Sequence, residues 1–212
     1  MNIKNFSKKL INKCFEVQFP AWEGKNFYDI ANLRNKKLLA KKYNLPSTIG
    51  IEPISFCTYD CEFCMIRELK THKYRSKPKM TAEDFRHIMV NISWFTTNIE
   101  FSGGEPTMNE HLYDMLNIAR DHCVYTTLAT NASLLNHKDN VKKILDSPPD
   151  AMLVSYEAME KSEYAITRKK GDLDNVRNGI EKLINEREKR NSRGPIITLQ
   201  TVVTKRNFNN IE

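Results

Sequence analysis

The sequence predicts an α/β fold, in which a parallel sheet alternates with helices. Short apolar segments recur between residues 48 and 203, and the segments between them carry apolar residues at helical spacing. Strand followed by helix, repeated, implies right-handed crossovers and parallel neighbours. Polar or glycine-rich clusters also follow directly after several of these strands. Because reactive groups gather at the carboxyl ends of the strands in such sheets, we expect one shared site there.

Five strands are expected, at residues 49–54, 98–102, 123–129, 151–156 and 196–203. The helices expected between them span residues 81–94, 109–121, 136–145 and 172–189. At the start of the first of these helices, Thr81 and Asp84 are spaced as a capping box, with Asp in the position usual for Glu or Gln.

The residues that precede the first expected strand are predicted to be helical. Residues 4–19 and 26–42 show helical spacing, and Pro46 ends this part. We therefore divide the chain into a helical lead-in, residues 1–46, and a core domain, residues 47–212.

The composition is that of a globular protein. Of the 212 residues, 40% are hydrophobic and 28% are charged, and no apolar run approaches the length that spans a bilayer. Residues 1–19 contain neither a continuous apolar stretch nor a small-residue cleavage site, so we expect a cytoplasmic protein without a membrane partner. The net charge of +7 is spread along the chain, which favours a solvated surface over a nucleic-acid partner.

Three of the five cysteines lie within eight residues. Cys57, Cys61 and Cys64 have the spacing C-x3-C-x2-C, directly after the first expected strand. An odd count with such a cluster is a poor disulfide framework and indicates a metal site. Three thiolates on one loop can hold three irons of a cubane cluster and leave the fourth iron open to a non-protein ligand. The residues leave one alternative open, a zinc site with His72 as the fourth ligand.

Three further motifs follow the next strands. Residues 101–107 read Phe-Ser-Gly-Gly-Glu-Pro-Thr, residues 129–132 read Ala-Thr-Asn-Ala, and residues 154–158 read Val-Ser-Tyr-Glu-Ala. In this order after the cysteine motif, they resemble the radical S-adenosylmethionine (SAM) superfamily over residues 46–203. The resemblance implies a partial (β/α) barrel with about five of its six strand–helix units present. We therefore expect the chain to be truncated at its C-terminus.

The resemblance also implies the chemistry. In that family the open iron of a 4Fe–4S cluster binds the amino and carboxylate groups of SAM. An electron from the cluster then cleaves the sulfonium to a 5′-deoxyadenosyl radical, which abstracts hydrogen from a substrate. Flavodoxin or ferredoxin is the expected electron donor.

Residues 36–52 bear on the substrate, since they resemble the start of the core in members with C-terminal SPASM or twitch extensions. Such members often modify peptides, so a peptide or protein substrate is favoured. A small molecule of cofactor biosynthesis is the alternative within the family. A zinc-stabilised module that binds nucleic acid is the alternative outside it.

Roles carried over from the family fall first on the cysteine loop and the second strand. The three cysteines bind the cluster, and Phe63 packs beside the adenine of SAM. Gly103 and Gly104 offer backbone to the methionine amino group, with no side chain to block its approach. Glu105 accepts a charge-assisted hydrogen bond from that ammonium.

Further roles fall on the third and fourth strands. Asn131 lies where the ribose or methionine part of SAM passes, and Ser155 and Arg168 contact its ribose and carboxylate. Two positions depart from the family pattern. Residues 157–158 are Glu-Ala where Asp-Gly is common, and Ala132 stands where Gly is usual.

Overall fold

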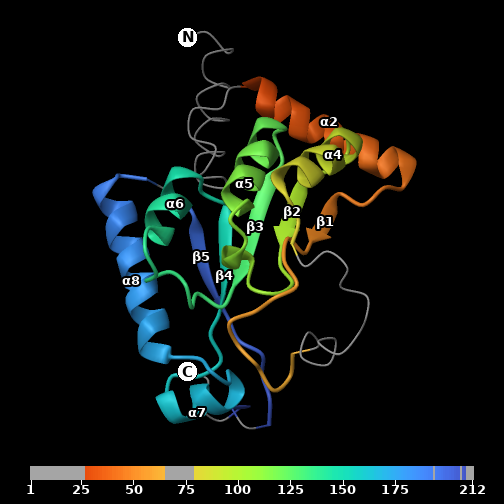
Figure 1. Cartoon of the computed structure of the whole chain (residues 1–212). Helices are drawn as coiled ribbons and strands as arrows, with labels where there is room; N and C mark the ends of the chain where they lie inside the picture. Colours follow the sequence, from red (N-terminus) through yellow and green to blue (C-terminus); the bar gives the residue numbers. More distant parts are fainter. Residues whose placement is uncertain (1–26, 65–78, 193, 206, 209–212) are drawn as a thin grey trace, which may run out of the picture.

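The computed structural model describes residues 27–64, 79–192, 194–205 and 207–208 (Figure 1). The helix expected at residues 4–19 and the possible zinc ligand His72 lie outside these ranges. Within them, one parallel sheet has the strand order β1-β2-β3-β4-β5. Its strands are β1 Thr48–Ile51, β2 Asn98–Phe101, β3 Tyr125–Thr130, β4 Ala151–Ser155 and β5 Ile196–Gln200. Each strand pairs with the next one along the chain, as the repeat of strand and helix predicts.

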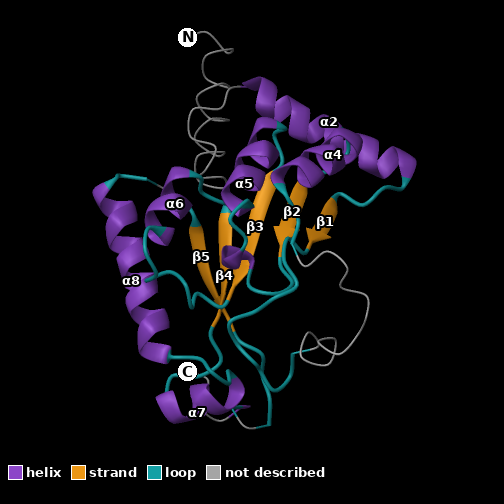
Figure 2. Ribbon diagram, in the orientation of Figure 1, coloured by secondary structure: helices purple, strands orange, loops and turns teal. Residues whose placement is uncertain are grey.

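The helices lie mainly on one face of the sheet (Figure 2). They are α2 Phe27–Tyr43, α4 Ala82–Ile92, α5 Leu112–Asp121, α6 Asn140–Asp146, α7 Lys161–Thr167 and α8 Leu173–Lys189. The capping box of Thr81 and Asp84 is present at the start of α4, as predicted. The short helix α7 lies beyond the carboxyl ends of the strands, beside the start of α8 (Figure 1). Among the described residues, no helix combines the length and the hydropathy needed to cross a membrane.

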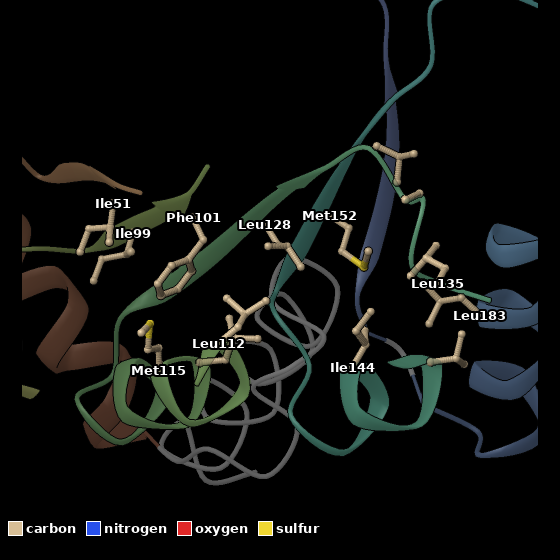
Figure 3. Close-up of a cluster of buried hydrophobic side chains, with 14 of the residues drawn as sticks. Ile51, Ile99, Phe101, Leu112, Met115, Leu128, Leu135, Ile144, Met152 and Leu183 are labelled. Atoms are coloured by element: carbon tan, nitrogen blue, oxygen red, sulfur yellow. The ribbon is translucent and has the colours of Figure 1, made fainter. Parts of the chain in front are cut away.

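The core fills the layer between the sheet and its helices (Figure 3). Ile99, Phe101 and Leu128 on the strands and Leu112 and Met115 on α5 are fully buried there. The alternate residues of β2, β3 and β4 point to the other face and stay half-exposed. Parallel sheets are normally covered on both faces. Among the described residues, a sheet covered by helices mainly on one face fits the predicted partial (β/α) barrel, with its helices outside.

Helix α2 is attached to the core by a buried lysine. Lys36 is 4% exposed, and its Nζ donates to the backbone oxygens of His122 at 2.5 Å and Cys123 at 3.3 Å. These carbonyls follow α5, where a cation complements the helix dipole. Because α2 contacts the core in this way, the domain boundary at residue 46 stays a prediction.

The helices expected from Asn109 and Asn136 begin three and four residues later, at Leu112 and Asn140, and α7 was not predicted at all. The helix expected from Asn109 begins at Leu112, after the 3₁₀ helix η2 Pro106–Met108. Asn109 instead uses its Nδ2 to bind the backbone oxygens of Pro53 at 2.7 Å and Met80 at 2.9 Å. The side chain of Asn109 therefore joins the loop after β1 to the segment before α4.

Candidate functional site

A cavity lies at the carboxyl ends of the strands, between the segments that follow β1, β2, β3 and β4. Nine of the ten expected site residues line it, namely Cys57, Cys61, Cys64, Gly103, Gly104, Glu105, Asn131, Ser155 and Arg168. Five lining residues were not expected, namely Tyr59, Asp60, Ser102, Ala129 and Thr130. The tenth expected residue, Phe63, is 39% exposed, and its ring centroid lies 5.3 Å from Cζ of Arg168.

The three cysteines line this one cavity as free thiols. Burial raises the pKa of the thiols of Cys57 and Cys61, because a thiolate there loses its water. Ionised thiolates at these positions need a compensating positive charge, which metal ligation supplies. Among the described residues, no three His, Cys, Asp or Glu side chains stand close enough to hold a single metal ion. In a cubane cluster each thiolate binds its own iron, so the sulfur atoms need not surround a single point. Three cysteines on one loop suit such a cluster.

Hydrogen-bond donors already point at two of the sulfur atoms. Cys57 Sγ accepts from the backbone nitrogen of Tyr59 and from Nδ2 of Asn131, both at 3.4 Å. Cys61 Sγ accepts from Nη1 of Arg168, also at 3.4 Å. Such donors stabilise negative charge on a ligating sulfur. The residues present therefore fit an iron–sulfur cluster.

The two glycines after β2 are required by the path of the cysteine loop. The backbone nitrogens of Gly104 and Glu105 donate to the carbonyl oxygens of Ile54 at 3.1 Å and Phe56 at 2.7 Å. A Cβ on Gly104 would lie 2.0 Å from the oxygen of Phe56, and Gly103 has a φ of +94°. Only glycine meets both demands without strain. The expected contact of these glycines with the methionine amino group stays a prediction.

Glu105 is completely buried and ties the end of β2 to the end of β3. Its Oε1 accepts from Oγ1 of Thr107 at 2.5 Å and Oγ1 of Thr130 at 2.7 Å. Its Oε2 accepts from the backbone nitrogen of Asn131 at 2.8 Å. Burial still raises the pKa of this carboxyl, although the donors oppose the rise. A cation brought to this wall of the cavity would favour the ionised carboxylate.

Arg168 is held by Glu157, a residue that departs from the family pattern and for which the sequence predicted no role. Nε and Nη2 of Arg168 bind the two carboxylate oxygens of Glu157, and the side chains are 11% and 1% exposed. Burial alone would lower the pKa of Arg168, but the ion pair with Glu157 raises it above its ordinary value. The carboxylate that the structure gives Arg168 is thus that of Glu157. Its expected contact with the carboxylate of SAM stays a prediction.

Comparison with known families agrees with this geometry. A match to the Radical SAM superfamily covers residues 51–204. The chain belongs to the radical SAM superfamily. Members of this superfamily use a 4Fe–4S cluster and SAM. The matched residues run from the end of β1 to beyond β5, so they include the whole lining of the cavity.

Individual radical SAM proteins resemble parts of the chain. It is 23% identical to PqqA peptide cyclase of Bradyrhizobium diazoefficiens over 130 residues, 61% of this chain and 33% of that protein. It is 27% identical to the probable GTP 3′,8-cyclase of Methanococcus maripaludis over 130 residues, 60% of this chain and 42% of that protein.

A solved structure shows the same fold. Streptococcus suis SuiB bound to precursor peptide SuiA superposes with a TM-score of 0.61 and 20% identity, over 86% of this chain and 39% of that one. The chain thus spans between a third and about two fifths of the length of the proteins it resembles.

Proposed function

We propose that this chain is the cofactor-binding core of a radical SAM enzyme. Cys57, Cys61 and Cys64 would hold a 4Fe–4S cluster, with SAM beside it in the same cavity. When bound, these cofactors would supply a 5′-deoxyadenosyl radical that abstracts hydrogen from a substrate. One observation carries the proposal: the cysteine loop and the motifs after β2, β3 and β4 line a single cavity.

The chain's own residues would bind and orient SAM in this cavity. Glu105 presents a buried carboxylate, and an ammonium beside it would offset the desolvation that raises its pKa. Asn131 and Ser155 line the wall where the ribose is expected. Arg168 uses some of its N–H groups on Glu157 and Cys61, and the guanidinium has further donors for a carboxylate. Phe63 offers an exposed ring for the adenine.

We propose a peptide or protein as the substrate. The names of PqqA peptide cyclase and of SuiB with its precursor peptide support this choice. The resemblance to a probable GTP 3′,8-cyclase supports a small molecule as the second candidate. Flavodoxin or ferredoxin would donate the electron. A cytoplasmic location suits the free thiols, because a reducing compartment keeps them unpaired.

The test is anaerobic reconstitution with iron and sulfide. We expect a brown protein that releases 5′-deoxyadenosine from SAM when reduced, and Cys57→Ala should lose the cluster. Cys123→Ala is the matched control, because Cys123 precedes β3 at the opposite end of the sheet. A colourless protein that binds zinc would contradict the proposal, and so would loss of the cluster in Cys123→Ala.

Substrate class needs a separate measurement. The reduced protein with SAM is offered either a peptide mixture or GTP, and the products are analysed by mass spectrometry. Modification of peptides supports the favoured substrate class. Consumption of GTP would favour the small-molecule candidate instead.

A further inference from the structure

The segment around the end of α7 is joined to the cysteine loop by main-chain hydrogen bonds. The backbone nitrogen of Asp60 donates to the oxygen of Lys169 at 3.0 Å, and that of Glu62 donates to the oxygen of Thr167 at 3.3 Å. Asp60 and Glu62 flank the middle cysteine of the motif. The loop that carries the cysteines is therefore fixed at two points by Thr167 and Lys169, which lie far from it in the sequence.

Arg168 lies between these two acceptors and reaches the same loop with its side chain. Its Nη1 lies 3.4 Å from Sγ of Cys61, and its Cζ lies 5.3 Å from the ring centroid of Phe63. The guanidinium thus contacts one cysteine and the aromatic residue two positions further on. A cation over an aromatic ring and beside a sulfur is held by electrostatic attraction on both sides.

Glu157 fixes the direction in which Arg168 points. Both carboxylate oxygens of Glu157 bind the guanidinium, a planar two-point contact that only Arg can make. The backbone of Glu157 is anchored in turn, because its carbonyl oxygen accepts from Nδ2 of Asn207 at 3.1 Å. A two-point pair that is almost fully buried leaves the arginine little freedom to turn away from Cys61.

We propose that Arg168, positioned by Glu157, is a tuning residue that orders the cysteine loop and places a positive charge beside the sulfur of Cys61. This rests on the proposed function, in which the three cysteines hold a cluster. A positive charge near a thiolate ligand stabilises the more negative, reduced cluster and raises its reduction potential. Arg168 acts through Cys61, so its effect is present before SAM binds.

The experiment compares four variants without SAM. Arg168→Gln removes the charge, Arg168→Lys keeps the charge without the planar fork, and Glu157→Gln weakens the two-point contact. The control is Lys161→Gln, which breaks the exposed ion pair between Lys161 of α7 and Asp174 of α8. For each protein, the midpoint potential of the cluster is measured by spectroscopic titration. Iron and sulfide are counted after desalting, and circular dichroism checks the fold.

We expect Arg168→Gln to lower the equilibrium constant for reduction about tenfold, a shift of about 59 mV to more negative potential for one electron. Arg168→Lys should shift the potential less. Glu157→Gln should retain less iron than the wild type. Lys161→Gln should match the wild type in both measurements.

Two outcomes overturn the inference. One is a native midpoint potential and native iron content in Arg168→Gln. If that variant does not fold, Arg168→Lys decides, because an ammonium lacks the planar fork that binds both carboxylate oxygens of Glu157 and still reaches Cys61. Iron retention equal to the wild type in Arg168→Lys would then overturn the inference. Failure of the wild type to take up a cluster is a different result, because it contradicts the proposed function itself.

Discussion

Two buried cations stand at opposite ends of the sheet, and they differ in what they face. At the amino end, Lys36 donates to two backbone carbonyls and attaches a helix to the core. At the carboxyl end, Arg168 faces a carboxylate and a thiol. Main-chain carbonyls occur in every protein, whereas a thiol can bind a metal and change its charge. The burial of a charge therefore indicates a functional site only where its partners carry chemistry.

Two buried carboxylates, Asp150 and Glu105, also lie at opposite ends of the sheet. Asp150 precedes β4, and its Oδ2 accepts from the backbone nitrogen of Thr126 at 2.7 Å. Glu105 follows β2 and binds the loop after β3. Both carboxylates tie neighbouring strands together. Of these two carboxylates, only Glu105 borders the cavity. Matched substitutions of the two can therefore distinguish effects at the carboxyl end of the sheet from effects at its amino end.

The largest effect is expected from adding a side-chain atom at Gly104, at the carboxyl end of the sheet. In Gly104→Ala the new Cβ meets the carbonyl oxygen of Phe56, which belongs to the backbone and cannot move aside. We expect the free energy of unfolding, measured in urea, to fall by about 3 kcal/mol, with poor cluster uptake. Gly50→Ala is the control, because a Cβ on Gly50 in β1 meets nothing within 4 Å. Equal losses in the two variants would contradict this account of Gly104.

Exchanging the buried carboxylates for amides should give the next effect. In Glu105→Gln an amide NH₂ group replaces one of the two carboxylate oxygens. This new donor then faces either the backbone nitrogen of Asn131 or the hydroxyls of Thr107 and Thr130, which are themselves donors. We expect a loss of about 2 kcal/mol in the free energy of unfolding and weaker SAM binding. Asp150→Asn should lose about 1 kcal/mol and bind SAM as the wild type does. Titration of both variants with SAM checks this, and equal weakening would remove the distinction between the two ends.

An effect smaller than that of Glu105→Gln is expected from the cation at the amino end. Lys36→Met keeps an unbranched side chain one atom shorter but leaves the carbonyls of His122 and Cys123 without this donor. We expect a loss of about 1.5 kcal/mol in the free energy of unfolding. Iron content and midpoint potential should stay at wild-type values. A shifted potential in Lys36→Met would show that the two ends are not independent.

The order of the strands and nine of the fourteen residues that line the cavity followed from the sequence, because both depend on local signals. The apolar strands are separated by helical segments, and the motifs sit directly after the strands. Helix α7 gave no such signal. It has seven residues, no side-chain hydrogen bond caps its start, and only Tyr164 and Thr167 are buried. A helix this short is stabilised by tertiary contacts rather than by its own sequence.

The partner of Arg168 could not be predicted for a related reason. Glu157 and Arg168 are 11 residues apart, outside the spacing at which residues of one helix meet. They meet only because the chain turns after β4 and returns through α7 (Figure 1). The same holds for Asn109, whose side chain binds two loops that are distant in sequence. Contacts of this kind follow from the fold and not from any local pattern.

The cysteine loop and the segment around Arg168 that contacts it lie far apart in the sequence, and this has a consequence during synthesis. Cys61 and Arg168 are 107 residues apart. At a rate of about 5–20 residues per second, the ribosome needs roughly 5 to 20 seconds to pass from one to the other. Throughout this interval the cysteines have been made while the arginine that will face them has not. The contacts between this loop and Arg168 can therefore form only several seconds after the cysteines have been made.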